Sequence, residues 1–332
     1  ILISHDRAFL DAIVKRTLAF ESGKVNEFPG NYSHYLEQSK ILREQLHRAY
    51  ENQQREINKA EQFINRFRAK ARRASQAQSR LKQLDRMERI QMAPSADKAI
   101  KLRFPQPERS GQVVIELTDA KRAYDQHVVF DQFNLRIERG EKIAVVGANG
   151  AGKSTFSRIL SGADPLSSGE RKTGYKVSVS HFAQDHAERL NPTKTVLQTV
   201  EGSAAQEVSG NLRSLLGCFL FRGDDVFKQV SVLSGGERSR LSLAKMLLKP
   251  ANFLILDEPT NHLDMQSQQI LQEALKAYQG SCVIVSHNRD FLDPITDKVI
   301  EFYPENKTPR IFLGNLSDFI DKKNQETASS PA

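Results

Sequence analysis

The sequence lacks tryptophan, has only two cysteines and contains no apolar run that approaches a membrane span. Cys218 and Cys282 are too few and too far apart for a disulfide framework or a cysteine-based zinc site. The longest apolar runs, residues 253–256 and 282–285, have the length of a strand, whereas a spanning helix needs about 20 apolar residues. The composition therefore excludes a disulfide-rich secreted domain and a membrane-spanning chain, and it favours a reducing, cytoplasmic location.

An initiator methionine and a secretory signal are also missing, because the chain starts at Ile1. We therefore expect the chain to be the C-terminal part of a longer protein. Its 332 residues are enough for two domains of roughly 100–200 residues each. With 39% hydrophobic residues, the chain is expected to fold around a proper core.

The basic residues are concentrated in one segment. The net charge is +8, and residues 40–103 hold 17 Lys or Arg against 7 Asp or Glu, so the rest of the chain is slightly acidic. Such clustering is typical of proteins that bind a phosphate backbone, although most charge runs are solvated helix faces. On charge alone both interpretations stay open. The candidate RNA-binding residues, at the densest point, are Arg66, Arg68, Lys70, Arg72 and Arg73.

Apolar residues in this basic segment recur at spacings of three and four, which is the pattern of a coiled coil. The two core positions of the repeat carry Leu46, Tyr50, Ile57, Ala60, Ile64, Phe67, Ala71 and Ala74, with Gln53 as the polar exception. A second stripe follows at Leu81, Leu84, Met87 and Ile90. The pattern predicts an antiparallel helical hairpin with a first helix over residues 41–74, about 50 Å long. Its turn is expected near residues 73–79, although no glycine or proline marks it.

A sequence repeat relates the two ends of the chain. Residues 3–11 (ISHDRAFLD) recur as residues 285–293 (VSHNRDFLD), and a fainter match relates residues 31–35 to 315–319. The repeat predicts that the complete protein carries two copies of one domain, with the basic arm between them.

From Val113 onward, short β-rich runs separated by glycines and amphipathic stretches indicate a mixed α/β domain. Pro94, Pro105 and Pro107 mark the connector that precedes it. We therefore divide the chain into the C-terminal end of a first domain, a basic helical-hairpin arm, a second domain and a disordered tail. The expected boundaries are residues 1–31, 32–104, 105–320 and 321–332.

The segment GANGAGKST at residues 147–155 matches the phosphate-binding pattern G-x-x-x-x-G-K-[ST] and follows an apolar strand at residues 142–146. Glycines permit a tight loop whose N–H groups point at phosphate oxygens, and the next helix adds its N-terminal dipole. Lys153 is expected to reach the β- and γ-phosphates, and the Ser154 hydroxyl to ligate Mg²⁺. The other loop residues expected at the nucleotide are Gly147, Asn149, Gly150, Gly152 and Thr155.

Two adjacent carboxylates, Asp257 and Glu258, follow the apolar strand at residues 253–256. Such a pair at the end of a buried strand is costly unless a cation lies close to it. We expect Asp257 to hold Mg²⁺ through water, and Glu258 to act as general base on the attacking water. Without the phosphate-binding loop, a solvated acidic turn would be the preferred interpretation.

At this point the motifs resemble those of ABC-type ATPases. LSGGE at residues 233–237 resembles their signature loop, whose Ser234, Gly235 and Gly236 contact the nucleotide. The resemblance implies an α/β fold, with a RecA-like core and antiparallel β and helical subdomains, preceded here by the arm. It also implies ATP and Mg²⁺ as cofactors.

Four single residues extend the resemblance. Gln184 is similar to the glutamine-loop residue that ligates Mg²⁺, and Asp264 is similar to the D-loop residue that couples paired sites. His287 is similar to the switch histidine that senses the γ-phosphate, and Tyr124 is similar to the aromatic residue that stacks on adenine. The resemblance implies catalytic roles for Lys153, Gln184, Glu258 and His287.

The sequences EPTNHLD at 258–264 and FLFRGDDVF at 219–227, together with the arm, resemble the ABC-F group. Members of this group carry two ABC domains joined by a charged linker and have no membrane domain. The resemblance implies an ATPase that acts on the ribosome, with the arm near the tRNA exit site contacting rRNA and tRNA. It also implies ATP-gated binding, and no membrane partner is expected.

In ABC enzymes the phosphate-binding loop of one domain and the signature loop of another enclose ATP. The first domain is expected to be mostly missing here, so we expect weak hydrolysis by this chain alone. Two alternatives stay open: the nucleotide-binding subunit of an ABC transporter and an ABC-type ATPase that acts on DNA. The choice between ATP and GTP also stays open.

Overall fold

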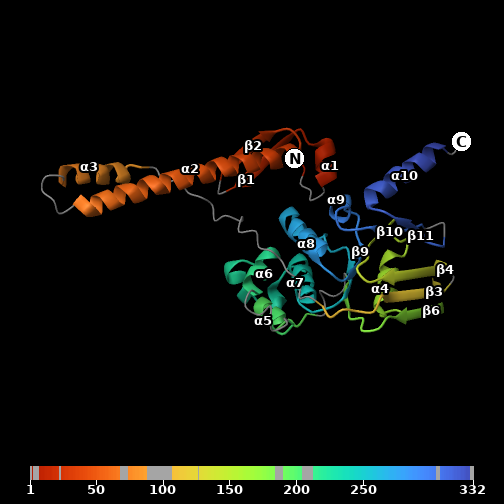
Figure 1. Cartoon of the computed structure of the whole chain (residues 1–332). Helices are drawn as coiled ribbons and strands as arrows, with labels where there is room; N and C mark the ends of the chain where they lie inside the picture. Colours follow the sequence, from red (N-terminus) through yellow and green to blue (C-terminus); the bar gives the residue numbers. More distant parts are fainter. Residues whose placement is uncertain are drawn as a thin grey trace. The chain divides into compact units, whose positions relative to one another are not determined.

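A computed structural model of the chain describes residues 2, 7–21, 24–67, 74–87, 107–125, 127–183, 190–203, 212–303 and 307–329 (Figure 1). The chain forms two compact units, residues 1–99 and residues 100–332. Across the helices of the described ranges, none combines the length and the apolar character needed to cross a membrane. The predicted mixed α/β class, with a helical region before it, is confirmed.

The first unit begins with a short helix and a two-stranded antiparallel sheet, whose pairing runs from Arg16 opposite Pro29 to Glu21 opposite Lys24. Gly30 then adopts a positive φ of 102°, which favours glycine, and the chain turns into a long helix. The elements are α1 (Arg7–Ile13), β1 (Arg16–Glu21), β2 (Lys24–Pro29), α2 (Tyr32–Phe67) and α3 (Ala74–Asp85).

The arm is the helical pair α2 and α3, which lie side by side (Figure 1). With 36 residues, α2 is about 54 Å long at 1.5 Å per residue. Within the predicted apolar stripe Ile57 and Ile64 are buried, whereas Leu46 is 41% exposed. The predicted turn at residues 73–79 is wrong, because α3 begins at Ala74 and α2 already ends at Phe67. The short polar side chains of residues 75–79 are compatible with a helix, and no glycine or proline stops one there.

The second unit contains a six-stranded sheet of order β11-β10-β5-β9-β8-β7 and a three-stranded antiparallel sheet of order β4-β3-β6. In the larger sheet only the β10–β11 pair is antiparallel. The strands are β3 (Val113–Tyr124), β4 (His127–Glu138), β5 (Lys142–Gly147), β6 (Ser168–Thr173), β7 (Val179–Phe182), β8 (Phe253–Asp257), β9 (Ser281–Val285), β10 (Lys298–Phe302) and β11 (Arg310–Leu313). The helices are α4 (Lys153–Ser161), α5 (Val196–Glu201), α6 (Leu212–Cys218), α7 (Gly235–Leu247), α8 (Met265–Ala277), α9 (Arg289–Leu292) and α10 (Leu316–Ser329), with short 3₁₀ turns η4 (Gly223–Phe227) and η5 (Val230–Val232).

Both faces of the six-stranded sheet are buried, so its central strands are apolar at successive positions. In β8, Ile255 belongs to the core that includes α4 and the three-stranded sheet, while Leu254 and Leu256 belong to the core on the opposite face. The first core contains four mutually packed aromatic rings, with ring centroids 5.1 to 6.4 Å apart: Phe130, Phe133, Phe156 and Phe302. This packing holds α4 against the sheet.

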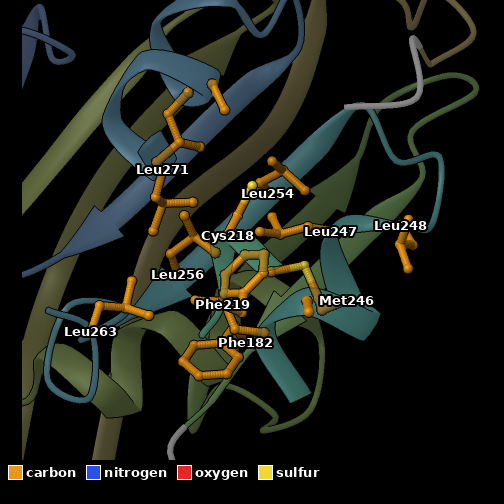
Figure 2. Close-up of a cluster of buried hydrophobic side chains, with 14 of the residues drawn as sticks. Phe182, Cys218, Phe219, Met246, Leu247, Leu248, Leu254, Leu256, Leu263 and Leu271 are labelled. Carbon is orange, nitrogen blue, oxygen red and sulfur yellow. The ribbon is translucent and has the colours of Figure 1, made fainter. Parts of the chain in front are cut away.

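The opposite core joins the sheet to the helical part of the unit. Figure 2 shows side chains of this cluster from β8, from α7 and from the segment at Cys218 and Phe219. Phe219 is 1% exposed and lies in the same cluster as Met246 of α7. The helix that begins at the signature loop therefore shares one apolar core with β8, the strand that ends at Asp257.

The C-terminal segment differs from the expectation. Residues 321–329, expected to belong to a disordered tail, form the second half of α10. Two ion pairs fasten this half to the sheet, because Lys323 pairs with Glu301 and Arg310 makes two 2.7 Å bonds to Glu326. Charged partners on β10 and β11 thus hold the polar second half of α10, whereas its first half contributes Leu316 and Phe319 to the apolar core.

Candidate nucleotide-binding site

The phosphate-binding loop lies between β5, which ends at Gly147, and α4, which begins at Lys153. Two of its glycines are required by close packing and by positive φ angles. A Cβ at Gly147 (φ 143°) would lie 2.3 Å from the Phe302 carbonyl oxygen, and one at Gly152 (φ 102°) would lie 2.1 Å from Cγ1 of Val129. The loop can therefore approach β10 and β4 only because these positions lack side chains.

The Lys153 side chain curls back into the loop. Its ammonium donates to the carbonyl oxygens of Gly147 at 2.8 Å and Ala148 at 2.9 Å, and the residue is 7% exposed. Burial lowers the pKa of Lys153, while the carboxylates of Glu258 and Asp257 oppose that shift. The cation therefore lies inside the loop and within electrostatic reach of both acidic residues.

Asp257 ends β8 and is 6% exposed. The hydroxyl of Ser157 donates to its Oδ2 at 3.4 Å, and Ser154 also lies close enough to favour its charged form. Burial nevertheless raises the pKa of Asp257, because desolvation outweighs the hydroxyls and the positive charges of Arg158 and Lys153. The predicted Mg²⁺ ligands Ser154 and Asp257 are thus brought together by α4 and β8.

Glu258 occupies an unusual backbone conformation at the end of the same strand. Its φ is 50°, a left-handed conformation uncommon for a residue with a side chain, and its N–H donates to the Val285 carbonyl oxygen at 2.8 Å. The buried Oε1 accepts no hydrogen bond from the described residues, and Nε2 of His287 lies 3.5 Å from it. Burial, and then the charge of Asp257, raise the pKa of Glu258 to about 7.

The signature residues are placed elsewhere in the unit. Ser234 caps α7: its hydroxyl accepts from the N–H of Glu237 at 3.3 Å, and its own N–H donates to the Glu237 carboxylate at 2.7 Å. Gly235 and Gly236 form the first turn of this helix. Within the described ranges, no hydrogen bond or ion pair joins residues 234–236 to the phosphate-binding loop of the same unit.

Of the remaining predicted residues, Asp264 caps α8, because its Oδ1 accepts from the N–H of Ser267 at 2.8 Å. Tyr124 ends β3 and is 40% exposed. Asn149 and Gly150 lie exposed at the outside of the loop, and Thr155 is buried in the first turn of α4. Gln184 lies outside the described residues, as do the arm residues Arg68, Lys70, Arg72 and Arg73, whereas Arg66 is exposed in the last turn of α2.

Sequence reasoning missed several side chains at the site. Ser157 lies one helical turn after Ser154, so the spacing of three along α4 would have indicated a second hydroxyl on the same face. Asp164 accepts from the hydroxyl of Tyr124 at 3.1 Å, although 40 residues separate them. No local sequence pattern predicts that contact.

The donor set fits a magnesium–nucleotide complex. A glycine loop without side chains at the two closest approaches, a buried lysine, and a hydroxyl beside a buried carboxylate are the groups that bind phosphates and Mg²⁺. Among the described residues no cluster of three His, Cys, Asp or Glu side chains could hold a metal by itself. Mg²⁺ commonly keeps waters and takes one or two protein ligands together with phosphate oxygens, which agrees with this sparse set.

Comparison with known proteins identifies the chain's relatives. Two family models, both described as "ABC transporter", match residues 18–104 and residues 130–261. "ABC transporter F family member 2" of Arabidopsis thaliana is 40% identical over 97% of this chain and 48% of that protein. The putative ATP-binding protein YdiF of Bacillus subtilis is 37% identical over 100% of this chain and 53% of that protein. The probable ATP-binding protein YheS of Escherichia coli K12 is also 37% identical, over 100% of this chain and 52% of its own length.

The chain thus spans about half the length of the curated relatives it matches. Among solved structures, an ATP-binding subunit of an ABC transporter superposes with a TM-score of 0.54 at 18% identity, over 64% of this chain and 93% of the other. That likeness shows a shared fold. ABC ATPase domains bind ATP together with Mg²⁺, and the donor set above fits both. The chain is therefore homologous over its whole length to about half the length of F-family ATP-binding cassette (ABC) proteins, and its second unit is an ABC ATPase domain.

Proposed function

We propose that the protein to which this chain belongs hydrolyses ATP between two ABC domains and uses the cycle to bind and leave the ribosome through its basic arm. The observation that carries the first part is the buried Glu258 carboxylate, whose Oε1 accepts no hydrogen bond from the described residues and lies 3.5 Å from Nε2 of His287. A carboxylic acid with a pKa of about 7 suits a general base at neutral pH.

The chemistry is divided among few side chains. Lys153 and the N–H groups of the loop bind the phosphates, while Ser154 and Asp257 hold the metal ion. Bound Mg²⁺ supplies charge neutralisation on the phosphate oxygens. Glu258 orients the attacking water and takes its proton, and His287 contacts the γ-phosphate side of the site. Gln184 and Tyr124 are assigned to the metal and the adenine only through the family resemblance.

A second ABC domain is needed to complete this site. Ser234, Gly235 and Gly236 make no bond to the phosphate-binding loop of their own unit within the described residues, and Asp264 is occupied as a helix cap. The exposed surface of residues 234–236 therefore suits the nucleotide of another domain. In the complete protein, the first ABC domain of the same chain fills that role in our proposal.

Repeated tertiary contacts support such a duplication. The N–H of Ser33 donates to Oδ1 of Asp11 at 2.7 Å, and the N–H of Ser317 donates to Oδ1 of Asp293 at 2.7 Å. An aromatic pair recurs as well, because ring centroids lie 5.0 Å apart for Phe28 and Tyr35, and 5.6 Å apart for Phe312 and Phe319. Such agreement extends the sequence repeat into three dimensions.

The exposure of the first unit points in the same direction. With the offset that relates His5 to His287, Leu18 and Phe20 of β1 correspond to Ile300 and Phe302 of β10. Ile300 and Phe302 are at most 2% exposed, but Leu18 is 51% and Phe20 is 77% exposed. The sheet face that an ABC domain covers in the second unit is therefore open in the first, which suits the core of a first ABC domain.

The charge of the arm supports an RNA partner. Residues 32–65 contain five Lys or Arg and five Glu, whereas residues 66–86 contain eight Lys or Arg and one Asp. Positive charge is thus concentrated in the end segment of the arm sequence, from the last turn of α2 through α3. RNA is bound through phosphates and shape by such surfaces, and the ABC-F resemblance makes ribosomal RNA and tRNA the proposed partners. A cytoplasmic location is part of the same proposal, because ribosomes and ATP are available there.

The test is co-sedimentation of this chain with ribosomes, with and without ATP, using Glu258→Gln to keep ATP bound. We expect ATP-dependent binding that is lost when three exposed basic residues of the end segment, residues 66–86, become Gln: Arg66, Lys82 and Arg86. The matched control neutralises three basic residues in the balanced part of α2: Lys40, Arg48 and Lys59.

Two results would overturn the ribosome proposal. One is the absence of ribosome binding with every nucleotide, together with capture by duplex DNA or a membrane protein. The other is an equal loss with the end and control variants, because binding would then follow total charge rather than its position. The ATPase part would stand in either case.

A further inference from the structure

Tyr124 is fixed by its neighbours at the end of β3. Its hydroxyl donates to Oδ2 of Asp164 at 3.1 Å, and the guanidinium of Arg122 lies 4.2 Å from the centroid of its ring. Arg122 is itself held, since its Nη1 donates to the Pro165 carbonyl oxygen at 3.0 Å. An aromatic ring that is 40% exposed is therefore kept in one orientation at the surface.

Asp164 belongs to the same folded segment as the phosphate-binding helix. At the end of α4, Gly162 adopts a φ of 81°, and the chain folds back so that the N–H groups of Ala163 and Asp164 donate to the Arg158 carbonyl oxygen. Nε of Arg158 then donates to Oδ2 of Asp164 at 2.9 Å. The carboxylate that accepts from Tyr124 is thus anchored to the helix that begins with Lys153.

The link is charge-assisted. Arg158, and then the hydroxyl of Tyr124, lower the pKa of Asp164 below its ordinary value, so the carboxylate is ionised at neutral pH. Hydrogen bonds to an ionised acceptor are stronger than neutral ones. The Arg158 guanidinium also lies 3.4 Å from the hydroxyl of Thr155, which places it beside the first turn of α4.

We propose that Asp164 and Arg158 are positioning residues that set the distance between the base and the phosphates of the bound nucleotide. Tyr124 stacks on the base, and Lys153 binds the phosphates. Hydrogen bonds from Tyr124 and from Arg158 to Asp164 connect the tyrosine to α4. The same helix begins with Lys153, so one rigid element connects the residue at the base to the residue at the phosphates. This inference rests on the nucleotide site described under the proposed function and adds the device that couples its two ends.

A purely structural role of Asp164 and Arg158 would change ligand binding in a different way. Tyr124, Arg158 and Asp164 belong to neither of the two apolar cores, so removing their polar contacts leaves the packing of the unit in place. The loss should therefore fall on ligands that contain a base and spare ligands that contain only phosphates. A general loosening of α4 would weaken both kinds of ligand.

The experiment compares binding of ATP and of tripolyphosphate, both with Mg²⁺, by calorimetry on the full chain. The variants are Tyr124→Phe, Asp164→Asn and the double variant. The controls are Tyr175→Phe, an exposed tyrosine, and Asp131→Asn, whose carboxylate pairs with Lys121 at 2.7 Å in the same three-stranded sheet. We expect Tyr124→Phe and Asp164→Asn each to weaken ATP binding about three- to tenfold and to leave tripolyphosphate binding unchanged. Because both variants interrupt the same link between Tyr124 and α4, the double variant should lose no more than Asp164→Asn alone, which also weakens the bond from Arg158.

Two results would overturn the inference: unchanged ATP affinity in both single variants, or equal losses for ATP and tripolyphosphate. Two further variants, Tyr124→Ala and Lys153→Ala, distinguish failure of this inference from failure of the nucleotide site itself. If Tyr124→Ala leaves ATP affinity unchanged, the base does not stack on Tyr124. If the unaltered chain binds neither ligand, or Lys153→Ala changes neither affinity, the nucleotide site itself is wrong.

Discussion

The Nε2 atom of His287 lies 3.5 Å from Oε1 of Glu258, yet the two side chains do not form an ordinary ion pair. Burial and the charge of Lys153 lower the pKa of His287, while burial and Asp257 raise the pKa of Glu258 to about 7. The imidazole is therefore neutral at pH 7 and the carboxylate is close to its midpoint. A pair in this state can exchange a proton with a neighbouring water.

The rate of ATP turnover should follow the ionisation of Glu258. A general base acts only when it is deprotonated, so turnover should rise with pH through about 7, the pKa of Glu258. Glu258→Gln should lower turnover by about 10²- to 10⁴-fold and abolish this rise. Turnover at saturating ATP from pH 5.5 to 8.5 provides the measurement. The control is Glu273→Gln, an exposed carboxylate on α8, and a profile shared by both variants would contradict the assignment.

The stability of the folded protein should depend on pH in the opposite direction to the turnover rate. The pKa of Glu258 is raised from 4.5 in the unfolded chain to about 7 in the fold, so the native state binds more protons between these values. The free energy of unfolding therefore decreases as pH rises through about 7. Glu258→Gln should relieve a penalty on the order of 1–3 kcal/mol at pH 8 and almost none at pH 4.

Urea denaturation of both proteins at the two pH values checks this difference. Asp257, whose pKa burial also raises, is present in both and cancels. A variant that gains nothing at pH 8 relative to pH 4 would show that the Glu258 carboxylate is not destabilised by its surroundings.

Alanine at Gly152 should be more damaging than alanine at another glycine of similar φ. Gly140 (φ 88°) has nothing within 4 Å of an added Cβ, whereas a Cβ at Gly152 meets Val129 at 2.1 Å. Gly140→Ala should cost about 1–2 kcal/mol for its left-handed backbone alone. Gly152→Ala should cost about 1–3 kcal/mol more because of the steric overlap. Thermal unfolding of both variants measures the difference, and equal losses would mean that Val129 moves aside freely.

Two copies of this chain should hydrolyse ATP by pairing head to tail, so specific activity should rise with protein concentration. Complementation makes this test sharper. Lys153→Ala keeps the signature loop, and Ser234→Arg keeps the phosphate-binding loop with Glu258, so a mixture can form one complete site. We expect two inactive variants whose mixture recovers activity.

The control for this mixture adds Glu258→Gln to the Ser234→Arg chain, which should remove the recovery. A turnover rate independent of concentration, with no recovery on mixing, would show that one chain is sufficient. The signature loop would then have no role in a second copy.

The sequence was informative where function depends on short segments. The strand–loop–helix at residues 142–155 and the carboxylates after the strand at 253–256 are local patterns, and the fold brings Lys153, Asp257 and Glu258 close enough for their charges to interact. By contrast, the contact of Tyr124 with Asp164 spans 40 residues and depends on how α4 ends at Gly162. Periodicity contains no information about such a contact.

The end of the first arm helix and the C-terminal segment show a second limit. Heptad spacing predicted a helix through residue 74, but α2 ends at Phe67 and α3 takes up the chain at Ala74. The spacing of apolar residues predicts which face of a helix is buried, but it does not predict where a polar segment leaves the helix. Likewise the polar composition of residues 321–329 concealed a helix that is held by Glu301 and Arg310, which lie earlier in the sequence.

The open face of the first unit has a practical consequence for handling the protein. Among the described residues β1 and β2 form a two-stranded sheet, and Leu18, Phe20 and Val25 are all more than half exposed on it. A short apolar ribbon to which the described residues add no further strand is a template for strand exchange and aggregation. The solubility of any preparation will therefore depend on what covers this ribbon, and substitutions that make it polar are the first choice for obtaining the ABC unit and its arm in monodisperse form.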